Sequence, residues 1–200
     1  MPEGKNSTKQ LMDWATATEH LSRMQIDLQI RPLHLEDLAA YKDLRDGMLA
    51  RHPEAFTSDA ATELQRDANS YRSRLSGGNG GANLFTLVGW QGADMVGAIS
   101  CEHEARLKIR HIAHIMGMMV REDLHGHGLG RQLLERTLHL LRGEAALELV
   151  TLSVTSSNTA AVKLYERCGF TRYGRLPGAI KLLDGRVLDK DLMCLRLRQP

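Results

Sequence analysis

Hydrophobic residues along the chain follow two rhythms, one typical of strands and the other typical of helices. A first strand is predicted at Leu28–Pro32, and helical spacing follows from Leu38 to Met48. A second helix is predicted over Ala61–Leu75, where apolar residues recur at intervals of three and four. Because proline disrupts a helical run, Pro53–Phe56 should separate these two helices.

The rest of the chain predicts strands and helices in alternation. Two strands are expected near residues 83–90 and 94–101, with Gln91-Gly92 as a hairpin turn. A third core strand is predicted from Ile109 to Val120. The elements that follow are predicted as helix, strand, helix and strand, at residues 129–143, 150–154, 161–168 and 193–197. Such an order predicts an α/β fold, with a mixed sheet and right-handed crossovers.

Length and charge limit the choice of function. The chain has 200 residues, which suits one domain, predicted at 26–200, preceded by an N-terminal extension at 1–25. The glycine-rich segment at 76–81 is expected to be a flexible loop. A formal net charge of +2 is too small to indicate a nucleic-acid partner or an anionic membrane surface.

The three cysteines, Cys101, Cys168 and Cys194, are odd in number and widely spaced, which argues against a disulfide framework and a CxxC metal site. The pair His125 and His127 has no evident third ligand, so no metal is expected. No apolar run reaches the roughly 18 residues that span a bilayer. Residues 1–25 show no apolar core of a signal peptide, and we expect a cytoplasmic protein.

A glycine-rich segment, His125–Gly130, lies between a predicted buried strand and an amphipathic helix. Such a loop exposes backbone N–H groups beside a helix N-terminus, where a pyrophosphate can bind. A turn that merely requires glycine is the alternative. The Walker pattern is excluded because Arg131 follows Gly130, and the dinucleotide pattern fails because its last glycine would fall on Arg131.

Two motifs in the second half of the chain resemble those of the GNAT superfamily of acetyl-CoA-dependent N-acetyltransferases. Val120–Leu134 is similar to motif A, with Gly128 and Gly130 in place and His125 where the family has Arg or Gln. Motif B is matched at Asn158, Leu164-Tyr165 and Gly169-Phe170. The resemblance implies a mixed sheet of about six to seven strands, flanked by about four helices and with splayed parallel strands in the middle.

The resemblance also implies a site for acetyl-CoA as cosubstrate, with no metal. The cleft would lie between the strand ending at Val120 and the strand ending at Val154, opened by a bulge near Gly117. Asn158 follows the second strand and would serve as a helix N-cap, a ligand contact, or both. The expected cofactor contacts are Met118, Met119 and Val120 for the pantetheine, and His125, Gly126, His127, Gly128, Leu129, Gly130 and Arg131 for the pyrophosphate.

The activity that the resemblance implies is acetyl transfer to a primary amine of a small molecule or a protein, by direct attack in a ternary complex. Tyr165 would protonate the departing thiolate. The acceptor would contact Leu35–Leu75 and Arg172–Asp191, neither of which identifies it. A non-catalytic acyl-CoA-binding regulatory module is the alternative function. A homodimer is the default assembly.

The base is less clear from the sequence. The positions that carry glutamate in two branches of the superfamily correspond here to His114 and Ser153. A serine cannot serve as the base, whereas an imidazole, with a pKa of about 6.5 in model peptides, accepts a proton near neutral pH. His114 is therefore the candidate, and a structural histidine with water as the proton acceptor is the alternative. Glu102 and Glu104 are further candidates.

Overall fold

A seven-stranded mixed sheet forms the centre of the protein in a computed structural model that describes residues 28–75 and 84–198. The strand order is β1-β2-β3-β4-β5-β7-β6, and β4 and β5 are parallel while all other neighbours are antiparallel. The predicted extension at 1–25 and the predicted loop at 76–81 lie outside the described residues. The strands are β1 (Leu28–Pro32), β2 (Leu84–Gln91), β3 (Asp94–His103), β4 (Ile112–Val120), β5 (Leu149–Thr155), β6 (Thr171–Lys181) and β7 (Val187–Arg196).

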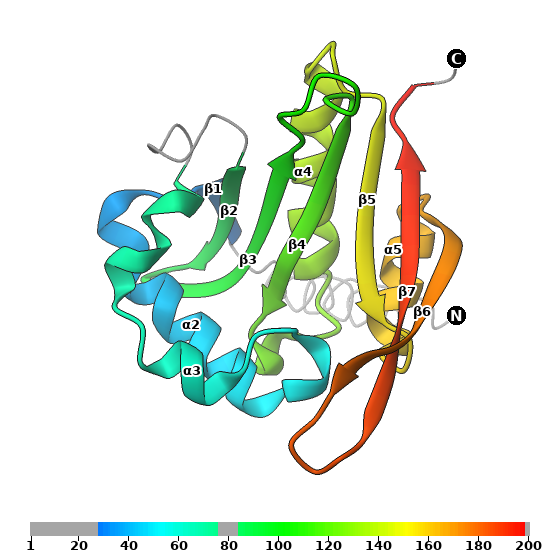
Figure 1. Cartoon of the computed structure of the whole chain (residues 1–200). Helices are drawn as coiled ribbons and strands as arrows, with labels where there is room; N and C mark the ends of the chain where they lie inside the picture. Colours follow the sequence, from blue (N-terminus) through cyan, green and yellow to red (C-terminus); the bar gives the residue numbers. More distant parts are fainter. Residues whose placement is uncertain (1–27, 76–83, 199–200) are drawn as a thin grey trace, which may run out of the picture.

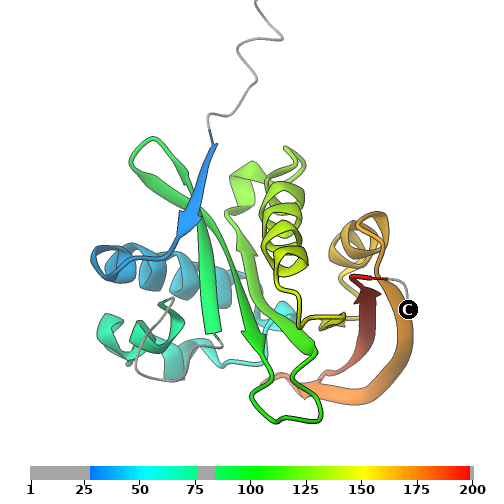
Figure 2. The same ribbon diagram turned by 90° about the horizontal axis from the view of Figure 1, so that it is seen from above.

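Helices cover both faces of this sheet. Helices α2 (Leu38–Arg51) and α3 (Ala60–Leu64) lie on one face, and α4 (Leu129–Gly143) and α5 (Thr159–Arg167) lie on the other (Figures 1 and 2). None of the helices in the described ranges is long and apolar enough to cross a membrane. The connections contain short 3-10 helices: η1 (Leu35–Asp37), η2 (Pro53–Ala55), η3 (Ala68–Arg74) and η4 (Glu122–Leu124).

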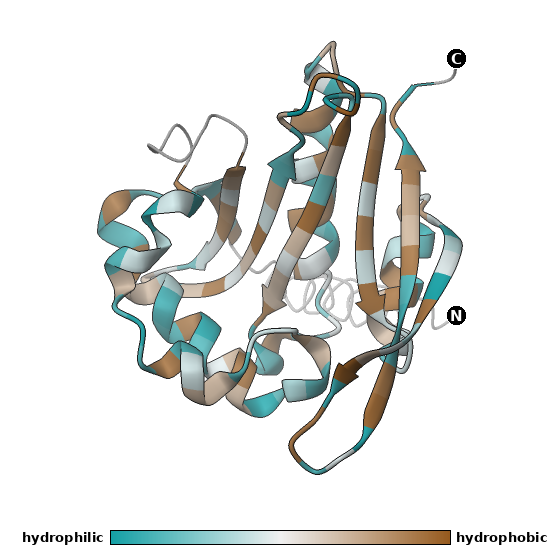
Figure 3. Cartoon of the chain, in the orientation of Figure 1, coloured by the Kyte–Doolittle hydropathy of each residue, from teal (hydrophilic) through white to brown (hydrophobic). Residues whose placement is uncertain are grey.

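Each face of the sheet buries its own hydrophobic cluster, which explains the largely apolar strands in Figure 3. Leu133 and Leu134 of α4 are fully buried against one face, together with Ile99 of β3. Tyr41 of α2 packs against the other face with Ala98, the residue next to Ile99. Successive strand residues thus serve opposite clusters, as the period of two along a strand requires.

Strand β4 contains one extra residue at the predicted bulge. Ala98 pairs with Met119 but Ser100 pairs with Met116, so Gly117 and Met118 together oppose one residue of β3. Gly117 has a φ of 59°, a left-handed conformation that favours glycine. The extra residue reverses the alternation of side chains along the strand.

This reversal divides the predicted site residues between two faces. Ile115, before the bulge, and Met118 and Val120, after it, all pack against the cluster under α4 and α5. Because neighbours in a strand alternate, His114 therefore lies on the face that carries α2. The position of His114 relative to Met118, which the sequence leaves open, is thus settled: they lie on opposite faces.

The parallel strands β4 and β5 pair over a short stretch only. Their ladder runs from Ile112 opposite Leu149 to His114 opposite Thr151, and no later residues of the two strands are paired. Strand β5 continues along β7 as far as Thr155. The predicted separation of the two parallel strands is confirmed, and beyond this ladder their facing backbone edges do not pair with each other.

The predicted helix over Ala61–Leu75 is wrong in its middle. It is broken into α3 and η3, because the Asp67 side chain accepts a hydrogen bond from the Asn69 N–H at 2.7 Å and starts a new turn. Leu64, expected on the apolar face, is 61% exposed. The helical spacing of apolar residues is therefore not enough to continue the helix past the turn that the Asp67 side chain stabilises.

Two strand predictions also need correction. Strand β4 begins at Ile112 rather than Ile109, because the Ile112 N–H donates to the Ile109 carbonyl in a turn. Strand β6 was not predicted, since Gly174, Pro177 and Gly178 interrupt its pattern and most of its residues are exposed. The predicted final strand at 193–197 corresponds to the second half of β7.

A buried carboxylate joins α2 to the segments that follow it. The Glu63 carboxylate accepts hydrogen bonds from Arg45 Nε at 3.0 Å, from the Tyr71 hydroxyl at 2.5 Å and from Arg66 Nη1 at 3.2 Å. Burial alone would raise the pKa of Glu63, but these hydrogen bonds outweigh it and lower that pKa from 4.5 to about 2. The carboxylate therefore holds α2, α3 and η3 together in its ionised form.

We expect Glu63→Gln to lower the free energy of unfolding at neutral pH by about 3 kcal/mol, since a carboxylate with a depressed pKa stabilises the folded state above its unfolded pKa. This contribution disappears as the pH falls from 4.5 toward 2, so parent and variant should converge in that range. Urea titrations at several pH values test this. Glu135→Gln, at an exposed ion pair, is the control and should cost less than about 1 kcal/mol. A difference that stays constant between pH 7 and pH 3 would contradict this role of Glu63.

Candidate active site

The glycine loop lies between β4 and α4 and has the geometry of an anion site. Gly126 and Gly128 have φ values of 81° and 80°, and a Cβ added at either would meet no atom within 4 Å. Gly128 is the N-cap of α4, and its carbonyl accepts from the Gln132 N–H. In the described part of the chain no acceptor pairs with the N–H groups of the first helical turn, Leu129–Arg131. These donors and the helix dipole favour an anion at this point.

Gly130 has a different role in the same loop. A Cβ at this position would lie 3.0 Å from Met118 Cε and 3.4 Å from a methyl group of Leu164. The missing side chain lets the start of α4 lie close to β4 and α5. Glycine is thus required for packing here and for backbone conformation at Gly128, so the turn interpretation and the anion interpretation are compatible.

The backbone of Val120 faces the gap between β4 and β5. The Arg121 N–H donates to the Val96 carbonyl across to β3 at 2.8 Å. Because backbone groups alternate in direction along a strand, the N–H and carbonyl of Val120 point away from β3. His125 Nε2 lies 2.8 Å from that carbonyl, so the loop histidine reaches the same strand end.

The two loop histidines are each engaged with the backbone. His125 contacts the Val120 carbonyl, and His127 Nδ1 lies 3.0 Å from the His125 carbonyl. Over residues 28–75 and 84–198, no three His, Cys, Asp or Glu side chains gather as a metal-binding group. The two rings therefore organise the loop backbone.

Tyr165 of α5 lies beside the end of β4. Its side chain is 8% exposed, and its hydroxyl is 3.5 Å from Met118 Sδ, a weak acceptor. The ring contacts Phe170 edge-on, with a centroid separation of 5.9 Å. Burial raises the pKa of Tyr165 to about 12, with a further contribution from Cys168, so the phenol stays protonated at neutral pH. A protonated donor thus lies at the bulge, on the α5 face.

Asn158 begins α5 directly after β5. Its side-chain oxygen accepts a hydrogen bond from the Ala161 N–H at 3.1 Å, which confirms the predicted N-cap. The cap fixes the start of α5, and Tyr165 lies two helical turns further along. Asn158 therefore positions Tyr165 through the helix, whatever ligand contact it makes.

On the opposite face of the sheet, His114 lies between two polar partners. Its Nδ1 is 2.5 Å from Thr151 Oγ1 on β5, and its Nε2 is 3.3 Å from Glu104 Oε1. Arg106 holds the same carboxylate at 2.9 Å, and hydrogen bonds from Arg106 and then His114 lower the pKa of Glu104. Glu102, the other acidic candidate, is exposed and has no such contact with His114.

Thr151 was not singled out from the sequence. It is placed by the last residue pair of the parallel ladder, where it stands opposite His114. Only knowledge of the register between β4 and β5 could have predicted that Thr151 contacts His114. Ser153, the other aligned position, lies two residues further along β5, beyond the paired stretch.

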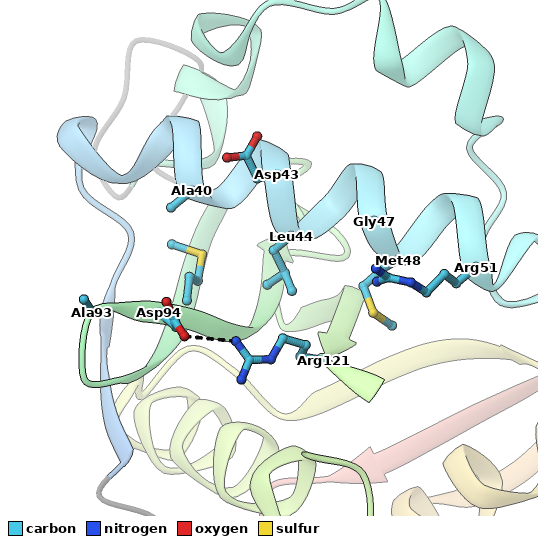
Figure 4. A pocket seen from close by; sticks show the side chains of 10 residues that line it. Ala40, Asp43, Leu44, Gly47, Met48, Arg51, Ala93, Asp94 and Arg121 are labelled. Atoms are coloured by element: carbon cyan, nitrogen blue, oxygen red, sulfur yellow. Dashed lines mark hydrogen bonds and ion pairs between the residues drawn. The ribbon is translucent and has the colours of Figure 1, made fainter. Parts of the chain in front are cut away.

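Two hollows lie away from these residues. One, of about 360 Å³, lies between α2 and the β2–β3 turn, where Arg121 forms an ion pair with Asp94 at 3.3 Å (Figure 4). The other, of about 460 Å³, is lined by residues 172–175 of β6. Neither is lined by a predicted cofactor or catalytic residue. The candidate site is therefore defined by the strand separation and the glycine loop.

A parallel strand pair that separates, with a bulge in the first strand followed by a glycine loop and helix, defines a fold of the acetyltransferase class. Residues 41–170 match the model of the acetyltransferase (GNAT) family. The protein belongs to the GNAT family, as the two motifs predicted.

Individual relatives cover different parts of the chain. Mycothiol acetyltransferase of Salinispora tropica is 45% identical over 62 residues, which are 31% of this chain and 20% of that protein. The N-alpha-acetyltransferase RimI of Mycobacterium tuberculosis is 33% identical over 112 residues, 56% of this chain and 58% of that protein. The chain thus spans about a fifth of the first relative and somewhat over half of the second.

A solved structure shows the same fold. YncA from Salmonella typhimurium, solved with its cofactor acetyl-CoA, superimposes with a TM-score of 0.70 at 23% identity. The match covers 87% of this chain and 96% of that one. The mixed seven-stranded sheet with helices on both faces is therefore the fold predicted from the resemblance.

We expect Gly128→Glu to abolish acetyl-CoA binding, because the new carboxylate would lie against the N–H groups of the first turn of α4. Isothermal titration calorimetry measures this directly. Gly185→Glu is the matched control, since Gly185 has a φ of 86°, an equally open surround and a place in the β6–β7 turn. Both variants carry similar backbone strain, and only Gly128→Glu should lose binding. Tight binding by Gly128→Glu would show that the loop does not hold the phosphates.

Proposed function

We propose that the protein transfers the acetyl group of acetyl-CoA to a primary amine by direct attack in a ternary complex. The observation that carries this proposal is the free edge of β4 at Val120, which leads directly into the glycine loop. Family membership supports it, as do the acetyl-CoA in YncA and the N-alpha-acetyltransferase activity named for RimI. The amine belongs to a small molecule or a protein.

The cosubstrate would lie across the free edge of β4. The pyrophosphate would accept hydrogen bonds from the N–H groups between Gly128 and Arg131. The pantetheine would pair with the edge of Met118–Val120, much as a missing strand would. The Val120 N–H, which points into the gap, would stabilise the oxyanion that forms when the amine attacks the thioester.

Tyr165 would supply the proton that the departing thiolate needs. Burial raises the pKa of Tyr165 to about 12, so the phenol keeps its proton at neutral pH and has one to give to the thiolate. The weak bond to Met118 Sδ leaves the phenol proton available.

We expect Tyr165→Phe to lower kcat by about a hundredfold, the usual contribution of a general acid. Acetyl-CoA affinity should barely change, because the ring and its contact with Phe170 remain. Steady-state kinetics with calorimetry tests both points. Tyr173→Phe, at a phenol that is 60% exposed on β6, is the control for loss of a tyrosine hydroxyl and should not reproduce the hundredfold loss of kcat. An unchanged kcat in Tyr165→Phe would leave Tyr165 with a packing role only.

His114 would accept the proton that the amine must lose, with Thr151 as the intermediary. Both ring nitrogens of His114 are engaged, so the amine proton would pass to the Thr151 hydroxyl while that hydroxyl gives its own proton to Nδ1. Glu104 would stabilise the imidazolium through Nε2. This arrangement brings the base in from the face opposite Tyr165, so that acid and base act on the two sides of the strand gap.

We expect the acid limb in the pH profile of kcat/KM to disappear or move in His114→Ala, assayed with the same amine as the parent. His139→Ala, at an exposed histidine of α4, is the control. Superimposable profiles for parent and His114→Ala would mean that water accepts the amine proton and that His114 has a structural role only.

Release of free CoA in the presence of a panel of amines tests the activity as a whole. Amine-dependent release supports the transferase. A protein that binds acetyl-CoA tightly but releases none with any amine would instead be the regulatory module, for which His125 at the usual Arg or Gln position is the supporting feature.

A further inference from the structure

Two arginines converge on the bulge of β4 from the face that carries α2. A Cβ placed on Gly117 would lie 3.8 Å from Arg74 Nη1 and 4.0 Å from Arg45 Nη1. Arg45 comes from the middle of α2 and Arg74 from the end of η3. Because position 117 has no side chain, the two guanidinium groups lie close to the backbone of the bulge.

Arg45 is oriented by its other nitrogens. Its side chain is 6% exposed, with Nε bound to Glu63 at 3.0 Å and Nη2 bound to Ser58 at 2.8 Å. Within the described residues no acceptor pairs with Nη1, the nitrogen nearest Gly117. This nitrogen is therefore a donor without a partner among the described residues, on a guanidinium whose other two nitrogens are fixed.

Arg74 is held beside it. Its Nη1 donates to Ser100 Oγ at 3.0 Å, and its guanidinium lies 6.0 Å from the ring centroid of Tyr41. The Tyr41 hydroxyl is itself buried without a hydrogen-bond partner among the described residues. Glu63 is the carboxylate bound to this cluster, and it is shared by Arg45 and Arg66. Positive charge at the bulge thus exceeds negative charge.

The bulge lies where the proposed reaction would take place. Gly117 precedes Met118, whose sulfur contacts the Tyr165 hydroxyl, and His114 lies three residues earlier on the arginine-bearing face. Neighbouring strand residues are about 3.3 Å apart along the chain. Gly117 is therefore about 10 Å along the strand from His114, and an acceptor in the strand gap would lie between the arginines and Thr151.

We propose that the amine acceptor carries a carboxylate, and that Arg45 and Arg74 bind this group over Gly117. The proposal rests on the transferase function and narrows it to compact amines of the free amino-acid type. Guanidinium groups hold a carboxylate through paired, charge-assisted hydrogen bonds. The N-terminus of a protein offers a neutral peptide carbonyl at the same distance from its amine and would not use this charge.

The test compares each acceptor with its uncharged counterpart. Free amino acids, their α-amides and short peptides beginning with the same residues are assayed for CoA release with parent and Arg74→Gln. For the parent, kcat/KM should be about ten- to a hundredfold higher for the acid than for its amide, the range expected for hydrogen bonds to a charged group. Arg74→Gln should remove this preference by raising KM for the acids and leave the amides unchanged.

Arg72→Gln is the matched control, since it removes one positive charge from the same η3 segment at an exposed side chain bonded to Asn69. It should keep the preference for acids. Arg45→Lys retains the positive charge but loses the planar guanidinium that donates two parallel hydrogen bonds. It should therefore weaken, but not remove, the preference for acids over amides. Thermal melting establishes that each variant is folded.

The two proposals can fail separately. Turnover of amines without any preference for acids, or a preference that survives in Arg74→Gln, would overturn the carboxylate site and leave the transferase intact. If no amine is turned over, calorimetry with N-acetyl amino acids still decides the point. Binding by the parent that is lost in Arg74→Gln would support the site, and no binding by the parent would overturn it.

Discussion

The extra residue at Gly117 is the constraint on which the rest of the site depends. Without it, side chains along β4 would keep one alternation, and Met118 would not lie against α5 beside Tyr165. Pairing between β4 and β5 ends at His114, three residues before the insertion. The single extra residue thus divides the proposed acid and base between the two faces of the sheet.

Features that depend on local chemistry were predictable from the sequence. The bulge and the start of α5 follow from residues whose conformational preferences are strong, Gly117 and Asn158. The glycine loop was recognised because Gly128 and Gly130 stand between a buried strand and an amphipathic helix. The roles assigned to Tyr165 and the loop donors remain predictions, although the structure gives each a compatible geometry.

Features that depend on distant partners were not predictable. Thr151 is 37 residues from His114 and meets it only through the register of a parallel ladder. The arginines at the bulge look like ordinary helix charges in the sequence, and only the folding of η3 against α2 brings them together. Leu64 is a further example of a property that the sequence pattern did not predict. Its helical spacing indicated burial, but the residue is exposed because the turn at Asp67 interrupts the helix.

The short ladder between β4 and β5 has a mechanical consequence. Three residue pairs are the direct connection between the half of the sheet that runs from β1 to β4 and the half formed by β5, β7 and β6. The six residues from Ile115 to Val120 extend about 20 Å beyond this ladder, so a rotation of about 5° there displaces the strand end by about 2 Å. A small change in the angle of this ladder is therefore amplified at the end of β4, where the glycine loop begins.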